Sequence, residues 1–154
     1  MTMTRLLVVA AIVGAAVLTV VALGTAATQS EKYKLSAKLV GGQEVPKAKA
    51  PKGAGGSFTG TLVENGSSRK LTWRLTFHGL SGKATAAHIH IGKRGKSGPV
   101  AVPLCGPCKS GAHGKTSVSK KVYDALEHGG AYANVHTAKN KNGEIRGQIK
   151  PTES

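Results

Sequence analysis

The sequence predicts an all-β domain, a Greek-key β-sandwich or barrel of about eight strands with one short helix. Beyond the first 27 positions, apolar residues recur with a period of two, the spacing of half-buried strands, rather than the longer period of helices. The chain holds 21 glycines, and Gly-rich turns divide the apolar segments into short stretches. Short strands separated by such turns are typical of sandwiches and barrels.

Two segments, residues 33–40 and 71–77, show the alternation most clearly. The second places four large apolar side chains on one face, and these are the expected core residues: Leu71, Trp73, Leu75 and Phe77. Strands are expected at residues 33–40, 57–64, 71–77, 84–91, 100–104, 116–122, 131–137 and 144–150. The Asn-Gly pairs at 65–66 and 142–143 predict hairpin turns, and residues 122–128 predict the short helix.

The first 27 residues are expected to lie outside this domain. Arg5 is followed by an uncharged apolar run, residues 6–23, and then by the small residues 24–27, Gly-Thr-Ala-Ala. This order is typical of a secretory signal peptide, but the run is also long enough to cross a bilayer as a helix if it is retained. Either a cleaved signal peptide or a retained membrane anchor makes residues 28–154 an extracytoplasmic domain, secreted or held at the cell envelope.

The expected domain is strongly basic. Residues 28–154 carry 21 Lys and Arg against 7 Asp and Glu, a formal net charge of +14. Such a charge attracts anionic surfaces of many kinds without selecting one of them. Six aromatic residues in an exported chain argue against specific nucleic-acid binding, which uses stacking side chains. The expected partner is therefore a protein that the sequence does not identify, or an anionic polymer of the cell envelope.

Three histidines form the strongest candidate site. His88 and His90 flank Ile89 in a predicted strand, so both imidazoles point to one face of the sheet. If the strand that carries His136 is a neighbour, three imidazoles share that face. Neutral imidazole is a preferred ligand of copper and zinc, so the pattern indicates a metal site. The alternative is that all three are polar residues on the solvent side of a sheet.

The last predicted strand adds two polar residues to this face. Glu144 and Arg146 alternate with Ile145, so a strand over residues 144–150 directs both away from the core. We expect them to lie beside the metal ligands and support them. The alternative is an ion pair on the surface.

The only two cysteines, Cys105 and Cys108, form the motif Cys-Gly-Pro-Cys of thioredoxin-type redox sites. Thioredoxin chemistry needs a helix after the first thiol, and here a Gly-rich loop follows instead. Exported cysteines usually pair, so a local Cys105–Cys108 disulfide is the first expectation. Two alternatives are a Cu(I) or zinc site completed by His113, and redox catalysis.

The chain offers no complete catalytic set. It lacks a Gly-x-Ser-x-Gly motif, and nothing in the spacing places Asp124, the only aspartate, in a Ser-His-Asp triad. Seven acidic residues give no support for a catalytic carboxylate pair. We therefore expect a protein that is not an enzyme.

Five sequence blocks, in order, resemble the CHRD domain, the module named after chordin. They are residues 39–46 (LVGGQEVP), 80–92 (LSGKATAAHIHIG), 98–100 (GPV), 130–137 (GAYANVHT) and 142–149 (NGEIRGQI). The resemblance implies a β-sandwich of poorly defined biochemical role, found in bacterial exported proteins and in an animal extracellular antagonist of growth factors.

A weaker similarity is to copper-zinc superoxide dismutase, a Greek-key barrel whose copper is held by a His-x-His pair and a later histidine. His88 and His90 match the pair, and His136 matches the later ligand. The loop histidines and the aspartate that hold zinc in that enzyme have no match here. The similarity therefore implies at most a site for copper alone, with Arg146 in the place of the arginine that guides the anion toward the copper in that enzyme.

Together these patterns predict an exported CHRD-type binding module, with copper or zinc held by His88, His90 and His136. Two other functions stay open. One is a metal-dependent oxidoreductase acting on superoxide or a related small oxidant. The other is a structural or adhesive module that binds anionic envelope polymers through its lysines.

Overall fold

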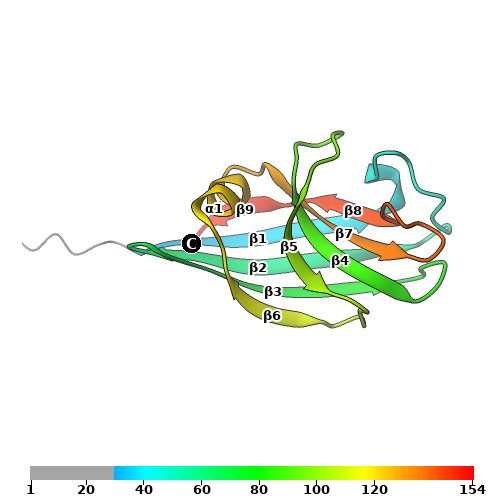
Figure 1. Ribbon diagram of the computed structural model, residues 1–154, viewed down its shortest axis with the longest axis horizontal. Coiled ribbons are helices and arrows are strands. Elements are labelled where there is room, and N and C mark those ends of the chain that lie inside the picture. Colours follow the sequence, from blue (N-terminus) through cyan, green and yellow to red (C-terminus); the bar gives the residue numbers. More distant parts are fainter. Residues whose placement is uncertain (1–29) are drawn as a thin grey trace, which may run out of the picture.

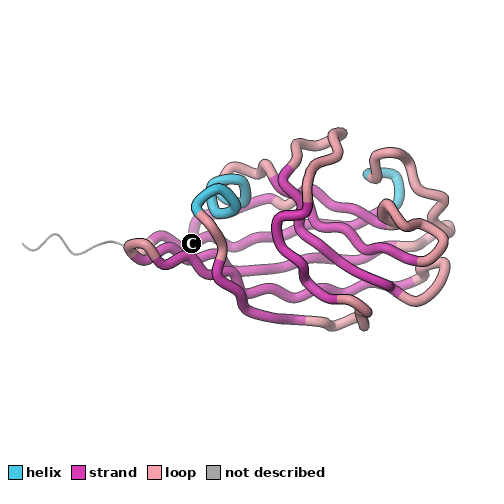
Figure 2. The backbone as a smooth tube through the Cα atoms, viewed as in Figure 1, coloured by secondary structure: helices cyan, strands magenta, loops and turns pink. Residues whose placement is uncertain are grey.

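The computed structural model describes residues 30–154, which form an all-β domain with one α-helix, as the sequence predicts. Strands dominate the backbone (Figure 2). In chain order they are β1 (Glu31–Val40), β2 (Gly55–Asn65), β3 (Ser68–His78), β4 (Ala84–Ile91), β5 (Val100–Cys105), β6 (His113–Ser117), β7 (Ala131–Thr137), β8 (Ile145–Gln148) and β9 (Lys150–Glu153). The helices are α1 (Lys120–Glu127) and the 3-10 turn η1 (Gly41–Gln43).

The predicted signal peptide or anchor, residues 1–27, lies outside the described residues. Within residues 30–154, no helix has both the length and the apolar character needed to cross a bilayer.

The strands form one continuous, nearly closed sheet in the order β5-β4-β7-β8-β1-β2-β3-β6, and β9 pairs with β1 (Figure 1). This is the barrel-like form of the predicted sandwich or barrel. The two edge strands, β5 and β6, do not pair with each other, which leaves a seam in the sheet. Because β6 pairs only with residues 70–74 of β3 and β5 only with residues 87–90 of β4, the end of β3 and the start of β4 border this seam. Residues 106–112 bridge this seam: the amide of Cys108 donates to the Ala84 carbonyl on β4 at 3.0 Å, and that of Gly111 to the Leu75 carbonyl on β3 at 2.9 Å.

The inner face of the sheet holds the apolar core. Of the predicted core residues on β3, Leu71, Trp73 and Leu75 are buried and Phe77 is half-buried. The side chains between them point outward, and most are exposed. Alternation along β3 therefore separates a buried face from a solvent-exposed face, as period-two patterning requires.

The outward face of β4, β7 and β8 is covered by loops and is shielded from solvent. All seven residues of β7 are buried, on both faces of the sheet. Two segments, which we call the covering loops, rise on the same side of the molecule (Figure 1): residues 41–54 between β1 and β2, and residues 92–99 between β4 and β5. Backbone carbonyls of the second loop accept hydrogen bonds from Arg146 and Gln148 on β8.

The predicted strand over residues 116–122 is wrong in its second half. β6 ends at Ser117, and α1 begins at Lys120, two residues before the predicted helix start. Ser119 is the reason, because its side-chain oxygen accepts a hydrogen bond from the Val122 amide and so caps the helix.

The predicted strand over residues 144–150 is two strands. β8 lies between β7 and β1 and pairs with both, whereas β9 pairs with β1, and Ile149 lies between β8 and β9. The Ile149 amide donates to the carbonyl of Ala131, the first residue of β7. The chain thus leaves β7 after Ile149 while it stays beside β1, which period-two alternation does not reveal.

Candidate metal centre

Strand pairing brings the three predicted histidines together. β4 runs antiparallel to β7, with His88 opposite Asn134 and Ala86 opposite His136. One ligand atom from each of His88, His90 and His136 can be chosen so that all three lie within 4.8 Å of one another. The Nδ1 atom of His88 lies 3.1 Å from Nε2 of His136. The His-x-His pair on β4 and the single histidine on the neighbouring strand β7 therefore form one cluster.

Backbone carbonyls fix the orientation of two of the rings. His90 donates its Nδ1 proton to the Gly98 carbonyl at 2.8 Å, and His136 donates its Nδ1 proton to the Lys141 carbonyl at 2.9 Å. In a neutral imidazole the other nitrogen then carries a lone pair, so both rings present Nε2 to the cluster. The Nε2 atom of His90 is buried and has no hydrogen-bond partner. Carbonyl bonds of this kind orient histidines that bind metals.

The cluster is shielded from water. His90 and His136 are only 8% and 9% exposed, so they are not polar residues on an open sheet face. Burial lowers the pKa of His88, and the neighbouring rings of His136 and His90 lower it further. Burial also lowers the pKa of His136, against the opposing effect of its bond to Lys141. Both rings are therefore held in the neutral form that binds a metal ion.

Tyr132 packs against one ring of the cluster, and Arg146 packs against Tyr132. The rings of His90 and Tyr132 are stacked, with centroids 4.9 Å apart and planes 4° from parallel. The guanidinium carbon of Arg146 lies 3.3 Å from the centroid of the Tyr132 ring. Arg146 also donates to the carbonyls of Lys93 and Lys96, at 3.2 and 2.8 Å. Since Arg146 is 1% exposed, its position suits support of the covering loop better than capture of an anion from solvent.

Glu44 is a buried acid that sequence reasoning did not assign to the site. Its side chain is 3% exposed and lines a cavity of about 370 Å³ together with His90 and His136. Burial raises the pKa of Glu44 to about 7, against the opposing effects of Arg146 and of a hydrogen bond to Asn134. A side chain at Gly143 would collide with its carboxylate. The burial of a charged residue in the Gly-Gly-Gln-Glu-Val-Pro segment is visible only in three dimensions.

The sequence matches the CHRD domain family over residues 35–149, which include all three histidines and every supporting residue named above. The chain belongs to the CHRD family. No curated protein and no solved structure matches it. The resemblance of the five sequence blocks is thereby confirmed, whereas the weaker similarity to superoxide dismutase gains no support.

In this CHRD domain Glu144 lies apart from the histidines. Its carboxylate accepts hydrogen bonds from the backbone and hydroxyl groups of Ser81, at 2.6 and 2.5 Å, from the Thr137 hydroxyl at 2.5 Å and from the Asn140 amide at 2.8 Å. Burial alone would raise the pKa of Glu144, but these bonds outweigh it and hold the pKa below its usual value. Glu144 precedes β8 and ties the β7–β8 turn to residue 81, so strand alternation did not predict its direction. Its contacts give it no part in the metal site.

The two cysteines of the CHRD domain form the expected local disulfide. Both sulfurs are thus bonded to each other, so neither thiol is free to bind Cu(I) or zinc. His113 is exposed and donates its Nδ1 proton to the Gly111 carbonyl at 3.2 Å. Within residues 30–154, the one group of three or more candidate ligands is that of His88, His90 and His136.

Proposed function

We propose that this CHRD domain is an extracytoplasmic binding module that holds one transition-metal ion, copper or zinc, through His88, His90 and His136. The observation that carries the proposal is the convergence of three ring nitrogens, one of which is buried without a partner. A buried polar atom without a partner is costly, and a metal ion at this position would satisfy it.

The distances suit a single ion. Histidine nitrogens bind zinc or copper at about 2.0–2.1 Å, so two ligands of a tetrahedral ion lie roughly 3.3 Å apart. The His88–His136 contact of 3.1 Å is already close to that spacing. The third nitrogen lies close by, because ligand atoms of all three rings are within 4.8 Å of one another.

Metal binding through Nδ1 of His88 would require the ring proton of His88 to move from Nδ1 to Nε2, but the protein would lose no proton. In the neutral tautomer of His136 whose Nδ1 proton is bonded to Lys141, Nε2 accepts a hydrogen bond from Nδ1 of His88. The Asn134 amide oxygen, 3.0 Å from the same Nε2 atom, would have to turn away when a metal ion binds there. To ligate through Nδ1, His88 must carry its proton on Nε2 instead. Both tautomers are neutral, and the lowered pKa of each ring favours them.

Three protein ligands leave a fourth position for an exchangeable group. The cavity of about 370 Å³ beside His90 and His136 provides room for a water molecule or a small ligand. Export is supported by the apolar run at residues 6–23, and imidazole ligands favour Cu(II) over Zn(II) in affinity. We therefore expect copper to bind more tightly than zinc at the same site.

Calorimetric titration of residues 28–154 with Cu(II) and with Zn(II) tests the proposal. We expect Cu(II) to bind one per chain with a Kd below about 1 μM, and His90→Ala to weaken binding at least about 100-fold. The matched control is His113→Ala, an exposed histidine on β6 that should leave the affinity unchanged. Binding should persist below the ordinary histidine pKa of 6.5, because the pKa values of His88 and His136 are lowered.

Two outcomes would replace this proposal. If Cu(II) binds no better to the wild type than to His90→Ala, and if salt-sensitive binding to anionic cell-wall polymers ignores the histidine variants, the domain is an adhesive module. If the copper-loaded protein consumes superoxide catalytically, the domain is an oxidoreductase.

A further inference from the structure

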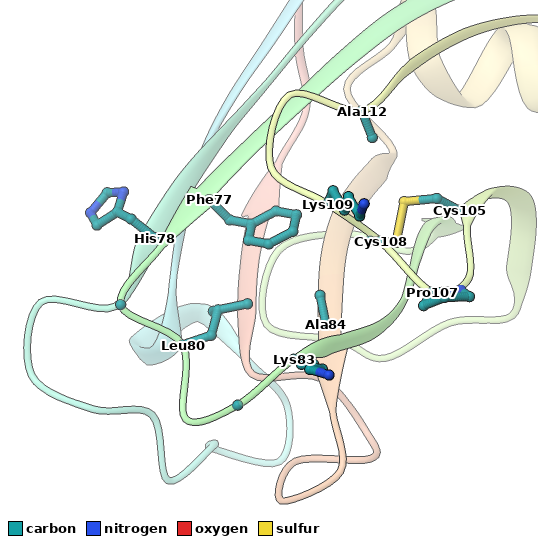
Figure 3. A pocket seen from close by; sticks show the side chains of 12 residues that line it. Phe77, His78, Leu80, Lys83, Ala84, Cys105, Pro107, Cys108, Lys109 and Ala112 are labelled. Atoms are coloured by element: carbon teal, nitrogen blue, oxygen red, sulfur yellow. A yellow bond between two sulfur atoms is a disulfide. The ribbon is translucent and has the colours of Figure 1, made fainter.

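A second cavity lies at the seam between β3 and β4, on a different part of the molecule from the histidines. Residues 79–83 connect β3 to β4, which do not pair with each other, and residues 106–112, which we call the disulfide loop, are hydrogen-bonded to both strands. The cavity between the connection and the loop has a volume of about 830 Å³ (Figure 3). It shares no lining residue with the cavity beside the histidines. We call it the seam pocket.

The interior of the seam pocket is apolar. Phe77 at the end of β3 and Leu80 on the β3–β4 connection line it from one side, and Ala84, Cys108 and Ala112 line it from the opposite side. Figure 3 shows Phe77, Leu80, Ala84 and Ala112 turned toward a common space. The small side chains of Ala84 and Ala112 leave that space open. Since Phe77 and Leu80 also pack against the main core, the pocket is an extension of the core that reaches the surface.

The mouth of the seam pocket is cationic. Lys83 and Lys109 lie on opposite sides of it, one on the β3–β4 connection and one on the disulfide loop, and both are exposed. None of the residues that line the pocket is acidic. An apolar cavity with two lysines at its entrance matches a ligand with an apolar body and an anionic end.

We propose that the seam pocket binds a free fatty acid, with its single acyl chain against Phe77 and Leu80 and its carboxylate between Lys83 and Lys109. The volume lies within the range of small-molecule sites, about 300–1,000 Å³, which suits one acyl chain rather than a two-chain lipid. Each methylene group that enters the pocket tightens binding about fourfold. This site does not depend on the metal centre.

Calorimetric titration with sodium decanoate, kept below its micelle concentration, tests the proposal. Decanoate should bind one per chain, and octanoate about sixteenfold more weakly, because two fewer methylene groups are buried. Decyltrimethylammonium, which has the same chain and the opposite charge, should bind at least about tenfold more weakly than decanoate. Decanoate should bind equally well to His90→Ala, which separates this result from the fate of the metal site.

Two pairs of variants locate the site. Lys83→Gln combined with Lys109→Gln should weaken decanoate at least about fivefold, whereas Lys34→Gln combined with Lys38→Gln, on the exposed face of β1, should change it less than about twofold. Ala112→Leu should fill the pocket and weaken decanoate about tenfold or more. Circular dichroism and thermal melting confirm that each variant is folded.

Any of four results would overturn the proposal. They are equal binding of decanoate and decyltrimethylammonium, decanoate binding that Ala112→Leu leaves unchanged in a folded protein, binding to phosphatidylglycerol vesicles without binding to decanoate, and no binding of decanoate at about 1 mM.

Discussion

The two halves of the sheet differ in what lies on their outward face. On β1, β2 and β3 that face is open, and residues such as Lys34, Lys38 and Arg74 are exposed to water. On β4, β7 and β8 the covering loops bury it, although its residues are just as polar. Water solvates the charges of the open half, whereas polar groups of the covered half depend on partners within the protein.

The covered half does not supply all of those partners. Among residues 30–154, four buried side-chain atoms of the covered half have no hydrogen-bond partner: Glu44 Oε1, His90 Nε2, Arg146 Nη1 and Gln148 Oε1. Natural proteins rarely leave such atoms unpaired without a bound water, ion or ligand. Two of the four atoms, in Glu44 and His90, belong to residues that line the cavity beside the histidine cluster, as the proposed binding of an ion or small ligand there requires.

Replacing an arginine in each half gives the largest expected difference. Arg146→Met should lower the free energy of unfolding by about 3 kcal/mol, because two carbonyls of the covering loop and the Glu44 carboxylate lose their cationic partner. Arg74→Met, on the open face of β3, should change it by less than about 0.5 kcal/mol. Urea denaturation at neutral pH measures both. If both substitutions changed the free energy of unfolding by the same small amount, the covered face would tolerate the loss of the Arg146 charge.

A similar contrast is expected between two glutamates. Glu144→Gln should destabilise the domain by about 2 kcal/mol at neutral pH, since the carboxylate accepts four hydrogen bonds. Glu64→Gln, which removes the partner of Arg69 on the open half, should cost at most about 1 kcal/mol.

The pH dependence of Glu144 provides a second readout. Its pKa lies below the ordinary value of 4.5, so its contribution is present above that pH and is lost as the pH falls through the lowered pKa. The stability advantage of the wild type over Glu144→Gln should therefore shrink in acid. An advantage that is constant from neutral to acidic pH would contradict this assignment.

Glu44 should behave in the opposite way. Its pKa is raised from 4.5 to about 7, so between these values the native state holds a proton that the unfolded chain has lost, and stability falls as the pH rises. In metal-free protein, Glu44→Gln should be more stable than the wild type by about 1–2 kcal/mol above pH 7. The two should become equal near pH 4.5, as measured by denaturation across this range. A variant less stable at every pH would show that Glu44 is ionised and well paired.

Strand alternation predicted the parts of this molecule that depend on one strand at a time. It placed His88 with His90 on one face, and it placed the core residues of β3, because side-chain direction in a strand follows from position alone. It could not predict that loops far along the chain would bury that polar face. Glu44 and Glu144 show the limit most clearly, because both lie outside regular strands. The direction of the Glu44 side chain depends on contacts with residues at least 90 positions away, and that of Glu144 on a contact about 60 positions away.

The smallest expected effect concerns one hydroxyl group on the covered half. The Gly98 amide donates to the Tyr132 hydroxyl at 3.2 Å, while the Gly98 carbonyl accepts the Nδ1 proton of His90. Tyr132→Phe keeps the ring that stacks on His90 but frees Gly98, so stability should fall by only about 1 kcal/mol.

Metal affinity should fall further than stability in this variant, by about tenfold, because the carbonyl that orients His90 is no longer held in place. The control is Tyr33→Phe, which removes a hydroxyl that donates to Glu127 at 2.8 Å near α1. It should cost a similar amount of stability and leave the copper affinity unchanged. If both variants bind copper as the wild type does, Gly98 does not position His90, and the ring is oriented by its stacking on residue 132 alone.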